Sequence, residues 1–531
     1  VTHIGTGLVS HVGAVLLRAI SVSMLLHGAA GAFSNRGGTL EVTEDDYRRS
    51  QRVDRIDDFI SHSWKTGRWP KFLTLCLVYN LRAASVASWL AAILVFFLEL
   101  DAVSFLSRPV RFDAWFGGQV RHHSMGVWGM LVCPLTFLVV GVFWQNLVPQ
   151  RMVFVDKFCI HQTDPQLKKA GIRGIAGFLR HSDRLVVLWT GSYFTRLWCT
   201  YELASWIHLG KSHIHFVPVS FAAVAGMMMS GLFAQFALVT LFRAVTGDLP
   251  LMIILLSLWM FCLLVTVSAR RHVRELSSLE NQLSAFSVQK TQCYCCDFGH
   301  VNPLTDEPMP CDRQLVYDAL KDWFSEYGAA TRSVTSSYGG ASKSLAPDTA
   351  ELSHLDFFDA QVRARVHSQL ISMGSYQLSY SHALMMASPF FWHLMEQATY
   401  LESLPWLEWA RFALHVMGTV FVAVPITYRM VFVLCTFYQR VLLRNSKIGQ
   451  SRLLQALVTV VSAVSLFCIS AALWFLASNP FYHTASFSPL ILVTFFLCVL
   501  CALIFCGCDW HRLRCSPATS AGMAENYDNC N

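Results

Sequence analysis

The chain has 531 residues, of which 54% are hydrophobic and only 14% are charged. This balance excludes an ordinary soluble α/β protein and predicts several apolar segments of about 20 residues that span a lipid bilayer. The net charge of +7 is typical of basic loops beside membrane spans. No basic run is interleaved with aromatic residues, so the sequence predicts no nucleic-acid partner.

Residues 1–50 predict an N-terminal segment followed by a linker. Leu8–Phe33 is apolar but contains two histidines and one arginine, which favours an amphipathic helix on a surface over a membrane span. Asn35–Gln51 is polar and contains glycine, as linkers do.

Residues 51–82 predict the first part of an α/β domain. Asp57–Trp64 has the pattern of a short strand that ends in a polar turn. Trp69–Arg82 has apolar residues at helical spacing, and the α/β pattern stops after it.

Residues 151–219 predict the second part of the same domain. Met152–Val155 and Leu185–Leu188 are strand-like runs, and a polar turn and a segment of helical period follow each of them. This alternation predicts βαβ units and a parallel sheet, with a last strand at His215–Val219. Thr195 is the expected N-cap of the second helix. The first helix carries an apolar stripe of Ile172, Ile175, Ala176 and Leu179.

Residues 83–150 separate the two parts of the domain. Ala84–Leu100 and Val127–Leu147 are apolar runs without internal charges, and they predict a transmembrane hairpin. Two crossings return the chain to the side on which it started. The strand at Phe59–Ser61 is therefore expected to pair with both later strands in one sheet.

The remaining chain predicts further spans around one soluble region. Residues 220–268 form a second hairpin, residues 269–404 a mostly helical soluble region that contains cysteines, and residues 405–508 three more spans before a tail at 509–531. The five spans in these regions are expected at Phe221–Phe242, Leu251–Ser268, Ala410–Phe437, Leu454–Ala477 and Pro489–Phe505.

Seven spans conflict with the distribution of positive charge. The loop Tyr438–Arg452 and the C-terminus are rich in arginine and lysine, which predicts that both face the cytosol. If residues 269–404 are also cytosolic, a single span at Ala410–Phe437 would place the loop Tyr438–Arg452 on the opposite side of the membrane from them. It therefore cannot keep both segments in the cytosol. Pro425 and Arg429 could mark a broken or paired helix there that restores parity.

A set of short motifs resembles a TIR domain in order along the chain. It covers residues 57–82 and 151–219, although two spans interrupt it and no fifth strand follows Val219. The resemblance implies a flavodoxin-like parallel sheet, self-association and signalling, and in some members cleavage of NAD at the nicotinamide bond. The matching motifs are Phe59-Ile60-Ser61-His62-Ser63-Trp64, Phe154-Val155-Asp156-Lys157, Gly171-Ile172, Ser182, Leu185–Leu188 and Trp198-Cys199-Thr200-Tyr201-Glu202-Leu203.

Ligands of such sheets bind beyond the carboxyl ends of the strands, where the strand order reverses. The resemblance places the family's catalytic glutamate at Glu202, where a carboxylate can stabilise an oxocarbenium-like ribose as nicotinamide leaves. Glu202 can equally be a solvated helix carboxylate, Trp198 a core residue and His62 a turn residue. The expected nucleotide-binding residues are Ser61, His62, Ser63, Trp64, Trp189, Tyr193 and Trp198.

A cysteine-rich motif between the spans predicts a metal site. Thiolates and one imidazole suit a tetrahedral structural zinc, although the spacing differs from a standard finger and the cysteines can also be free or acylated. The candidate ligands are Cys293, Cys295, Cys296, His300 and Cys311.

Three functions compete. The first is a membrane-anchored TIR-like signalling or adaptor protein whose cytosolic α/β domain self-associates. The second is a membrane-bound NAD+ hydrolase that uses Glu202. The third and most remote is a transporter or channel with a TIR-like regulatory domain, which would need more charged groups in its spans than Arg411 and Arg429.

Overall fold

The computed structural model of the chain contains two compact units. The sheet unit comprises Val1–Ala84, Leu138–Ala225 and Arg271–Tyr376, and the helical unit comprises Ser85–Phe137, Gly226–Arg270 and Gln377–Asn531. The structure describes residues 13, 15–33, 43–116, 119–246, 251–301, 306, 308, 311–320, 355–356, 358–360, 362–364, 366, 378–402, 404–442, 451–483 and 488–514. Residues 333–349, whose composition rich in serine, glycine and alanine predicts a flexible loop, lie outside the described residues.

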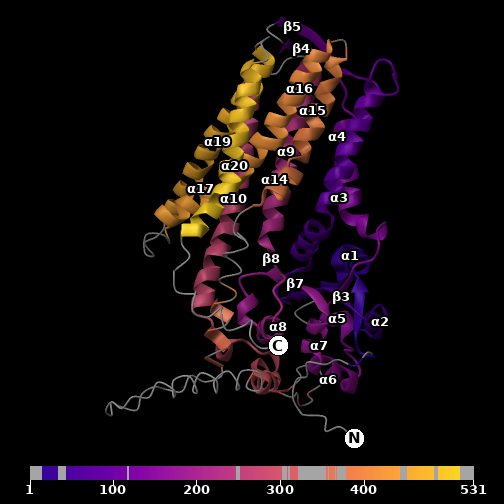
Figure 1. Ribbon diagram of the computed structural model, residues 1–531, viewed down its shortest axis with the longest axis vertical. Coiled ribbons are helices and arrows are strands. Elements are labelled where there is room, and N and C mark those ends of the chain that lie inside the picture. The colour runs from indigo at the N-terminus through magenta and orange to yellow at the C-terminus, as the bar shows by residue number, and fades with distance from the viewer. Residues whose placement is uncertain are drawn as a thin grey trace, which may run out of the picture. The chain divides into compact units, whose positions relative to one another are not determined.

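The sheet unit is built on a six-stranded sheet with the order β2-β1-β6-β3-β7-β8. Strands β3, β7 and β8 of this sheet are labelled in Figure 1. Strand β3 pairs in parallel with both β6 and β7, and β8 continues the parallel arrangement beyond β7. The predicted central position of the first strand is therefore confirmed. The strands are β1 (Arg18–Ser21), β2 (Gln51–Arg52), β3 (Ile56–His62), β6 (Met152–Phe154), β7 (Ser182–Trp189) and β8 (Ile214–Pro218).

The parallel strands form the core of the sheet unit. Every residue of β7 from Leu185 to Trp189 is buried, and Phe59 of β3 stacks on Phe154 of β6 with ring centroids 4.4 Å apart. Strands that are covered on both faces need continuous apolar runs, which is the pattern these segments have in the sequence. The predicted α/β sheet with parallel pairing is present.

The N-terminal segment differs from the prediction because it joins this sheet. Arg18–Ser21 forms β1, antiparallel to β6, so the expectation of one amphipathic helix over Leu8–Phe33 is wrong there. Strand β1 covers an edge of β6 that would otherwise leave backbone groups unpaired. Helix α1 (Val22–Ala30) and the turn η1 (Gly31–Phe33) follow it. The expected linker contains α2 (Glu44–Arg48) as well as β2.

Short helices connect the parallel strands. The expected single helix with the apolar stripe is two helices, because the chain turns at Gly174 between α6 and α7. Asp164 caps α6 by accepting from the backbone N–H groups of Gln166 and Leu167. Thr195 was expected to cap α8, but Arg196 occupies the N-cap position. The elements are α5 (Asp156–Cys159), α6 (Pro165–Arg173), α7 (Ile175–Arg180), η3 (Tyr193–Thr195) and α8 (Leu197–His208).

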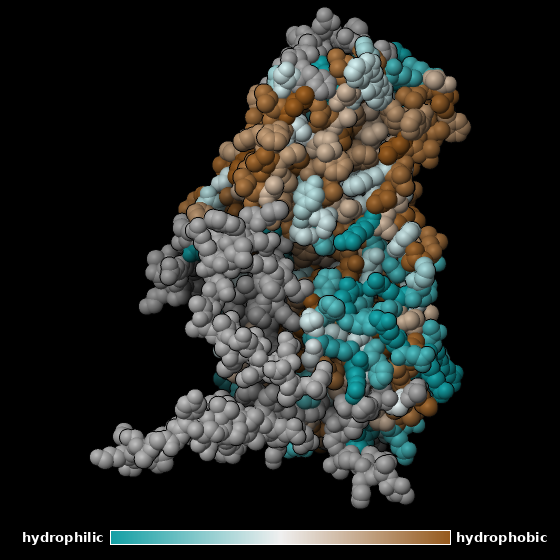
Figure 2. Space-filling view, viewed as in Figure 1, coloured by the Kyte–Doolittle hydropathy of each residue, from teal (hydrophilic) through white to brown (hydrophobic). Residues whose placement is uncertain are grey.

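Among the residues that the structure describes, seven helices are long and apolar enough to cross a membrane, and they coincide with the seven predicted spans. Figure 2 shows mainly hydrophobic residues on the visible surface of these helices. The chain thus has the composition of a multi-pass membrane protein. The helices are α3 (Arg68–Glu99), α4 (Gly129–Phe143) with η2 (Trp144–Asn146), α9 (Ser220–Thr246), α10 (Leu251–Ser284), α16 (Trp406–Gly418) continued by η6 (Thr419–Ala423) and α17 (Val424–Leu442), α19 (Arg452–His483) and α20 (Ser488–Arg514).

Two features of these segments differ from the prediction. The expected break near Pro425 and Arg429 is a π-helical turn, η6, inside one continuous span. The loop of the first hairpin contains an antiparallel pair of strands, β4 (Val110–Phe116) and β5 (Gln119–Met125).

The helical unit also contains a broken helix that was assigned to the soluble region. Helices α14 (Tyr380–Met386) and α15 (Ser388–Gln397) are joined at Ala387 and continue into η5 (Ala398–Leu401). Polar residues such as His393 and Glu396 lower the hydropathy of this segment, which hid it in the sequence. Both have partners, since Glu396 accepts from the Met130 backbone N–H at 2.8 Å and the His393 ring lies 2.9 Å from the Gln397 amide.

The broken helix runs parallel to α3. Ser85 donates to the carbonyl of Met385 at 3.1 Å, Trp392 donates to Ser88 at 3.1 Å, and the Asp101 backbone N–H donates to Glu402 at 3.0 Å. The segment from Ser85 to Asp101 corresponds to about 24 Å of helix at 1.5 Å per residue. That length is most of the roughly 30 Å hydrocarbon core of a bilayer.

Candidate functional site

The carboxyl ends of β3 and β7 lie side by side at one edge of the sheet. Ser61 and His62 are in register with Val187 and Leu188, so the loops that follow the two strands start next to each other. The sequence predicted a ligand site at this edge because the strand order reverses there. The residues around it form two polar clusters.

The first cluster joins Glu202 of α8 to the end of β3. The Ser61 hydroxyl donates to the Glu202 carboxyl at 2.5 Å and lies 2.6 Å from the Tyr193 hydroxyl. Glu202 therefore faces the sheet edge and not the solvent on the far side of its helix, as predicted. Burial, the largest cause, raises the pKa of Glu202 to about 8. At neutral pH this carboxyl is mainly protonated, so it is a proton donor more often than an anion.

The second cluster surrounds His62. Its Nδ1 atom lies 3.3 Å from the Lys71 ammonium, and its Nε2 atom lies 3.9 Å from the Asp156 carboxylate. Trp64 donates its indole N–H to Asp156 at 2.9 Å, and the edge of the Phe33 ring packs on His62 at 4.7 Å. Burial and the neighbouring ammonium lower the pKa of His62 well below its usual value, so the ring is neutral.

Sequence reasoning named Asp156 only as part of a motif and did not name Lys71. Asp156 lies two residues after the end of β6, a parallel strand, so the rule that identified Ser61 could have found it as well. Lys71 carried no comparable signal, because it lies in the first turn of a long apolar helix. Its side chain is only 1% exposed, and its partner His62 becomes evident only in three dimensions.

The other predicted binding residues have different surroundings. Trp189 is fully buried and packs on Phe216 with ring centroids 5.8 Å apart, so it supports the sheet. The hydroxyls of Ser63 and Ser192 lie 3.4 Å apart between the two loops. Trp198 donates to Asp312 at 3.2 Å and therefore faces the cysteine-rich region.

A segment that we call the cover segment, Glu275–Gln292, bonds to both loops at the sheet edge. Glu275 accepts from the backbone N–H of Gly191 at 3.2 Å, and the Gln292 side chain accepts from Lys65 at 2.8 Å. The Gln292 backbone also donates to the carbonyl of Thr195 at 2.6 Å, next to the start of α8. Its last residues include the short turn η4 (Val288–Lys290). No pattern in the sequence predicted these contacts.

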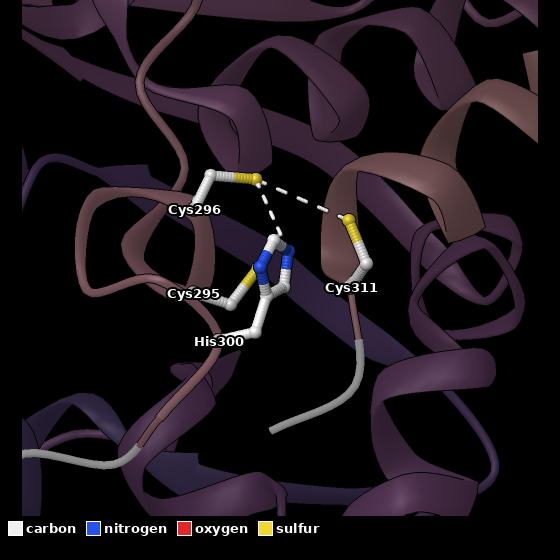
Figure 3. A group of neighbouring side chains, drawn as sticks. All are labelled: Cys295, Cys296, His300 and Cys311. Atoms are coloured by element: carbon white, nitrogen blue, oxygen red, sulfur yellow. Dashed lines mark hydrogen bonds between the residues drawn. The ribbon is translucent and has the colours of Figure 1, made fainter. Parts of the chain in front are cut away.

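The cysteine-rich region brings four of the five predicted metal ligands together (Figure 3). Ligand atoms of these four residues all lie within 4.8 Å of one another. The Cys293 sulfur is outside this set and lies 3.1 Å from the Cys295 sulfur. The predicted convergence of Cys311 with the earlier cysteines is confirmed. The four residues are Cys295, Cys296, His300 and Cys311.

Comparison of the chain with protein-family models, with curated proteins and with solved structures gave no match. The function is therefore inferred from the residues and contacts described above.

Proposed function

We propose that this chain is a membrane-anchored, TIR-like signalling protein that acts through self-association of its sheet unit. The parallel order β6-β3-β7-β8 and the seven apolar helices support this combination of module and anchor. One observation favours signalling by self-association over catalysis. The polar groups at the sheet edge already bond to one another and to the cover segment, as the pair Ser61–Glu202 and the contact Lys65–Gln292 illustrate.

Helix α6 is the proposed assembly surface. It lies in the polar stretch after β6, which forms self-assembly contacts in TIR-like domains. Leu167 is 37% exposed there, and Lys168 and Lys169 beside it are also exposed. An apolar residue flanked by two cations suits a contact with an apolar, acidic surface on a second copy.

Reversing both charges, as Lys168→Glu with Lys169→Glu, is expected to weaken self-association at least tenfold. Like charges placed opposite each other across an interface oppose binding, and tenfold corresponds to about 1.4 kcal/mol. The measurement is the dissociation constant of the full chain in detergent, obtained by fluorescence cross-correlation of two labelled populations. The control is Lys290→Glu, which changes an exposed lysine elsewhere in the sheet unit. Equal association of the double variant and the wild type would contradict α6 as the surface.

We further propose eight crossings and a cytosolic sheet unit, with the broken helix α14–α15 as the eighth crossing. This count removes the conflict between seven spans and the positive charges. It places residues 269–376, the basic loop after α17 and the C-terminus on one side, where the excess of lysine and arginine predicts the cytosol. The basic residues of that loop are Arg440, Arg444, Lys447 and Arg452.

Glycosylation sequons inserted into the loops test the number of crossings. A sequon between Ser478 and Ser488 is expected to be glycosylated, because that loop would face the lumen, whereas one between Leu442 and Ser451 is expected to remain unmodified. A sequon placed at residues 333–349 serves as the control for the cytosolic side. Modification of that control would contradict the cytosolic orientation, and modification between Leu442 and Ser451 would remove the eighth crossing.

Cleavage of NAD is the second candidate, and the position of Glu202 favours it. The carboxyl is recessed beside Ser61 and Tyr193, where low-dielectric surroundings would strengthen its effect on a developing positive charge. A ribose would have to displace part of this network, so NAD would be a substrate of an opened state. The third candidate, transport, has less support because Arg411 pairs with Glu408 at 2.9 Å and Arg429 donates to the carbonyl of Leu378 at 2.8 Å. Both arginines thus have structural partners.

A further inference from the structure

We infer that Cys295, Cys296, His300 and Cys311 bind one zinc ion at a structural site. Three thiolates and one imidazole form a common ligand set for structural zinc, which prefers four ligands in a tetrahedron. The inference is independent of the proposed signalling function, because it depends only on these four side chains and on the segments that carry them.

The distances between the ligand atoms suit a tetrahedral zinc ion. The sulfurs of Cys296 and Cys311 lie 3.9 Å apart, and the Cys296 sulfur lies 3.7 Å from Nε2 of His300. A zinc ion at about 2.3 Å from sulfur and about 2.0 Å from nitrogen places its ligand atoms roughly 3.5–4 Å apart. The two sulfurs are also well beyond the roughly 2.05 Å of a disulfide bond.

The backbone delivers the ligands from two short segments. Cys295 and Cys296 lie on one turn, α11 (Tyr294–Asp297), and Gly299 and His300 then adopt left-handed backbone conformations with φ of 61° and 63°. The His300 backbone N–H donates to the carbonyl of Cys295 at 2.7 Å, which turns the imidazole back towards Cys296. A left-handed conformation is unfavourable for histidine, and such strain is typical of ligand sites.

Cys311 comes from a second segment, and its neighbours support the site. It directly precedes the helix at residues 312–320, and the Asp312 backbone N–H donates to the Cys295 sulfur at 3.2 Å. The Arg313 guanidinium donates to the carbonyls of Gln289 at 2.8 Å and Thr291 at 2.6 Å, which ties this helix to the chain just before Cys293. Backbone and side-chain donors around ligand atoms are typical of metal sites.

Cys293 is the alternative ligand, and its position argues against it. Its sulfur lies 3.1 Å from that of Cys295, which is closer than the roughly 4 Å expected for two thiolates on one zinc ion. It groups with Cys295 and Asp312 but not with His300 or Cys311. Serine in place of Cys293 should therefore leave zinc binding intact.

The zinc ion would join the cysteine-rich segment to the helix that carries Glu202. Asp312, next to Cys311, accepts from Trp198 of α8 at 3.2 Å, and Gln292, just before Cys293, bonds to Thr195 before α8. A metal that holds both segments together would also fix these two contacts. Removal of zinc should therefore loosen the cover segment at the sheet edge.

The test is the metal content of the full chain purified in detergent under reducing conditions. Wild type is expected to contain about one zinc ion per chain, and the variant C296S/C311S close to none. Cys293→Ser and Cys468→Ser, an exposed cysteine of α19, are the matched controls that should retain zinc. Wild-type protein that lacks zinc and does not take up added Zn²⁺, or C296S/C311S protein that retains it, would overturn the inference.

Two further measurements keep the test informative if C296S/C311S does not fold. Cobalt exchanged into the wild type is expected to give thiolate-to-cobalt charge-transfer bands and the visible absorption of a tetrahedral site, and His300→Cys should bind cobalt with stronger charge-transfer absorption. Chelation should increase amide hydrogen exchange in residues 292–300. A six-coordinate cobalt spectrum without charge transfer would show that the thiols are free.

Discussion

The variant Asp58→Ala is expected to lose about 3 kcal/mol of unfolding free energy in the sheet unit. Asp58 lies on the central strand β3, is 1% exposed, and accepts two hydrogen bonds from Arg184, at 2.7 Å and 2.9 Å. Tyr79 donates a third hydrogen bond at 2.8 Å. Removal of one partner of a buried ion pair typically costs about 3–5 kcal/mol, because it leaves the other charge unpaired. We expect a cost at the lower end of this range, because 32% of the Arg184 side chain is exposed and water can solvate part of its charge.

The measurement is the denaturant dependence of hydrogen exchange at β3 and β7 in the full chain. Asp54→Ala is the matched control, since Asp54 is an exposed aspartate four residues earlier, and its effect should stay within about 0.5 kcal/mol. The double variant Asp58→Ala with Arg184→Ala should be less destabilised than the sum of the two single variants. Equal stability of Asp58→Ala and Asp54→Ala would show that the buried pair contributes nothing to the sheet.

Glu202 is expected to make the stability of the sheet unit fall as the pH rises. Burial raises its pKa from 4.5 to about 8 in the folded chain, so the folded state binds the proton more tightly than the unfolded state does. The contribution is therefore fully present below about pH 4.5 and is lost as the pH rises through about 8. At 1.36 kcal/mol per pKa unit, and with a discount for partial exposure, the loss is about 3 kcal/mol.

Glu202→Gln is the matched variant, because its amide stays neutral and can keep the hydrogen bond to Ser61. Its stability should be nearly independent of pH between about 5 and 8 once other titrations, common to both proteins, are subtracted. Parallel pH profiles of stability for Glu202→Gln and the wild type would show that the pKa of Glu202 is not raised by folding.

The same variant also tests cleavage of NAD. If the ionised carboxylate assists cleavage, wild-type activity should rise towards pH 8, and Glu202→Gln and Glu202→Ala should be inactive.

Local patterns in the sequence were sufficient to predict many of the structural elements of this protein. The spans were predictable because a bilayer requires long apolar helices, and the described residues contain a helix that is long and apolar enough at each of the seven predicted positions. The parallel strands at Phe59, Met152 and Leu185 were predictable because buried strands have continuous apolar runs. The cysteine-rich motif predicted that Cys311 would lie near Cys293, Cys295, Cys296 and His300, and ligand atoms of all of these except Cys293 lie within 4.8 Å of one another.

Contacts between distant segments could be decided only by the tertiary structure. Strand β1 was missed because its pairing with β6 joins residues more than 130 positions apart. The broken helix α14–α15 was missed because its polar residues resemble those of a soluble segment until their partners, such as the backbone of Met130, are known. The surroundings of Glu202 also could not be predicted from the sequence. Whether a carboxyl is an exposed anion or a buried acid depends on which hydroxyls and which apolar walls fold against it, here Ser61 and Tyr193.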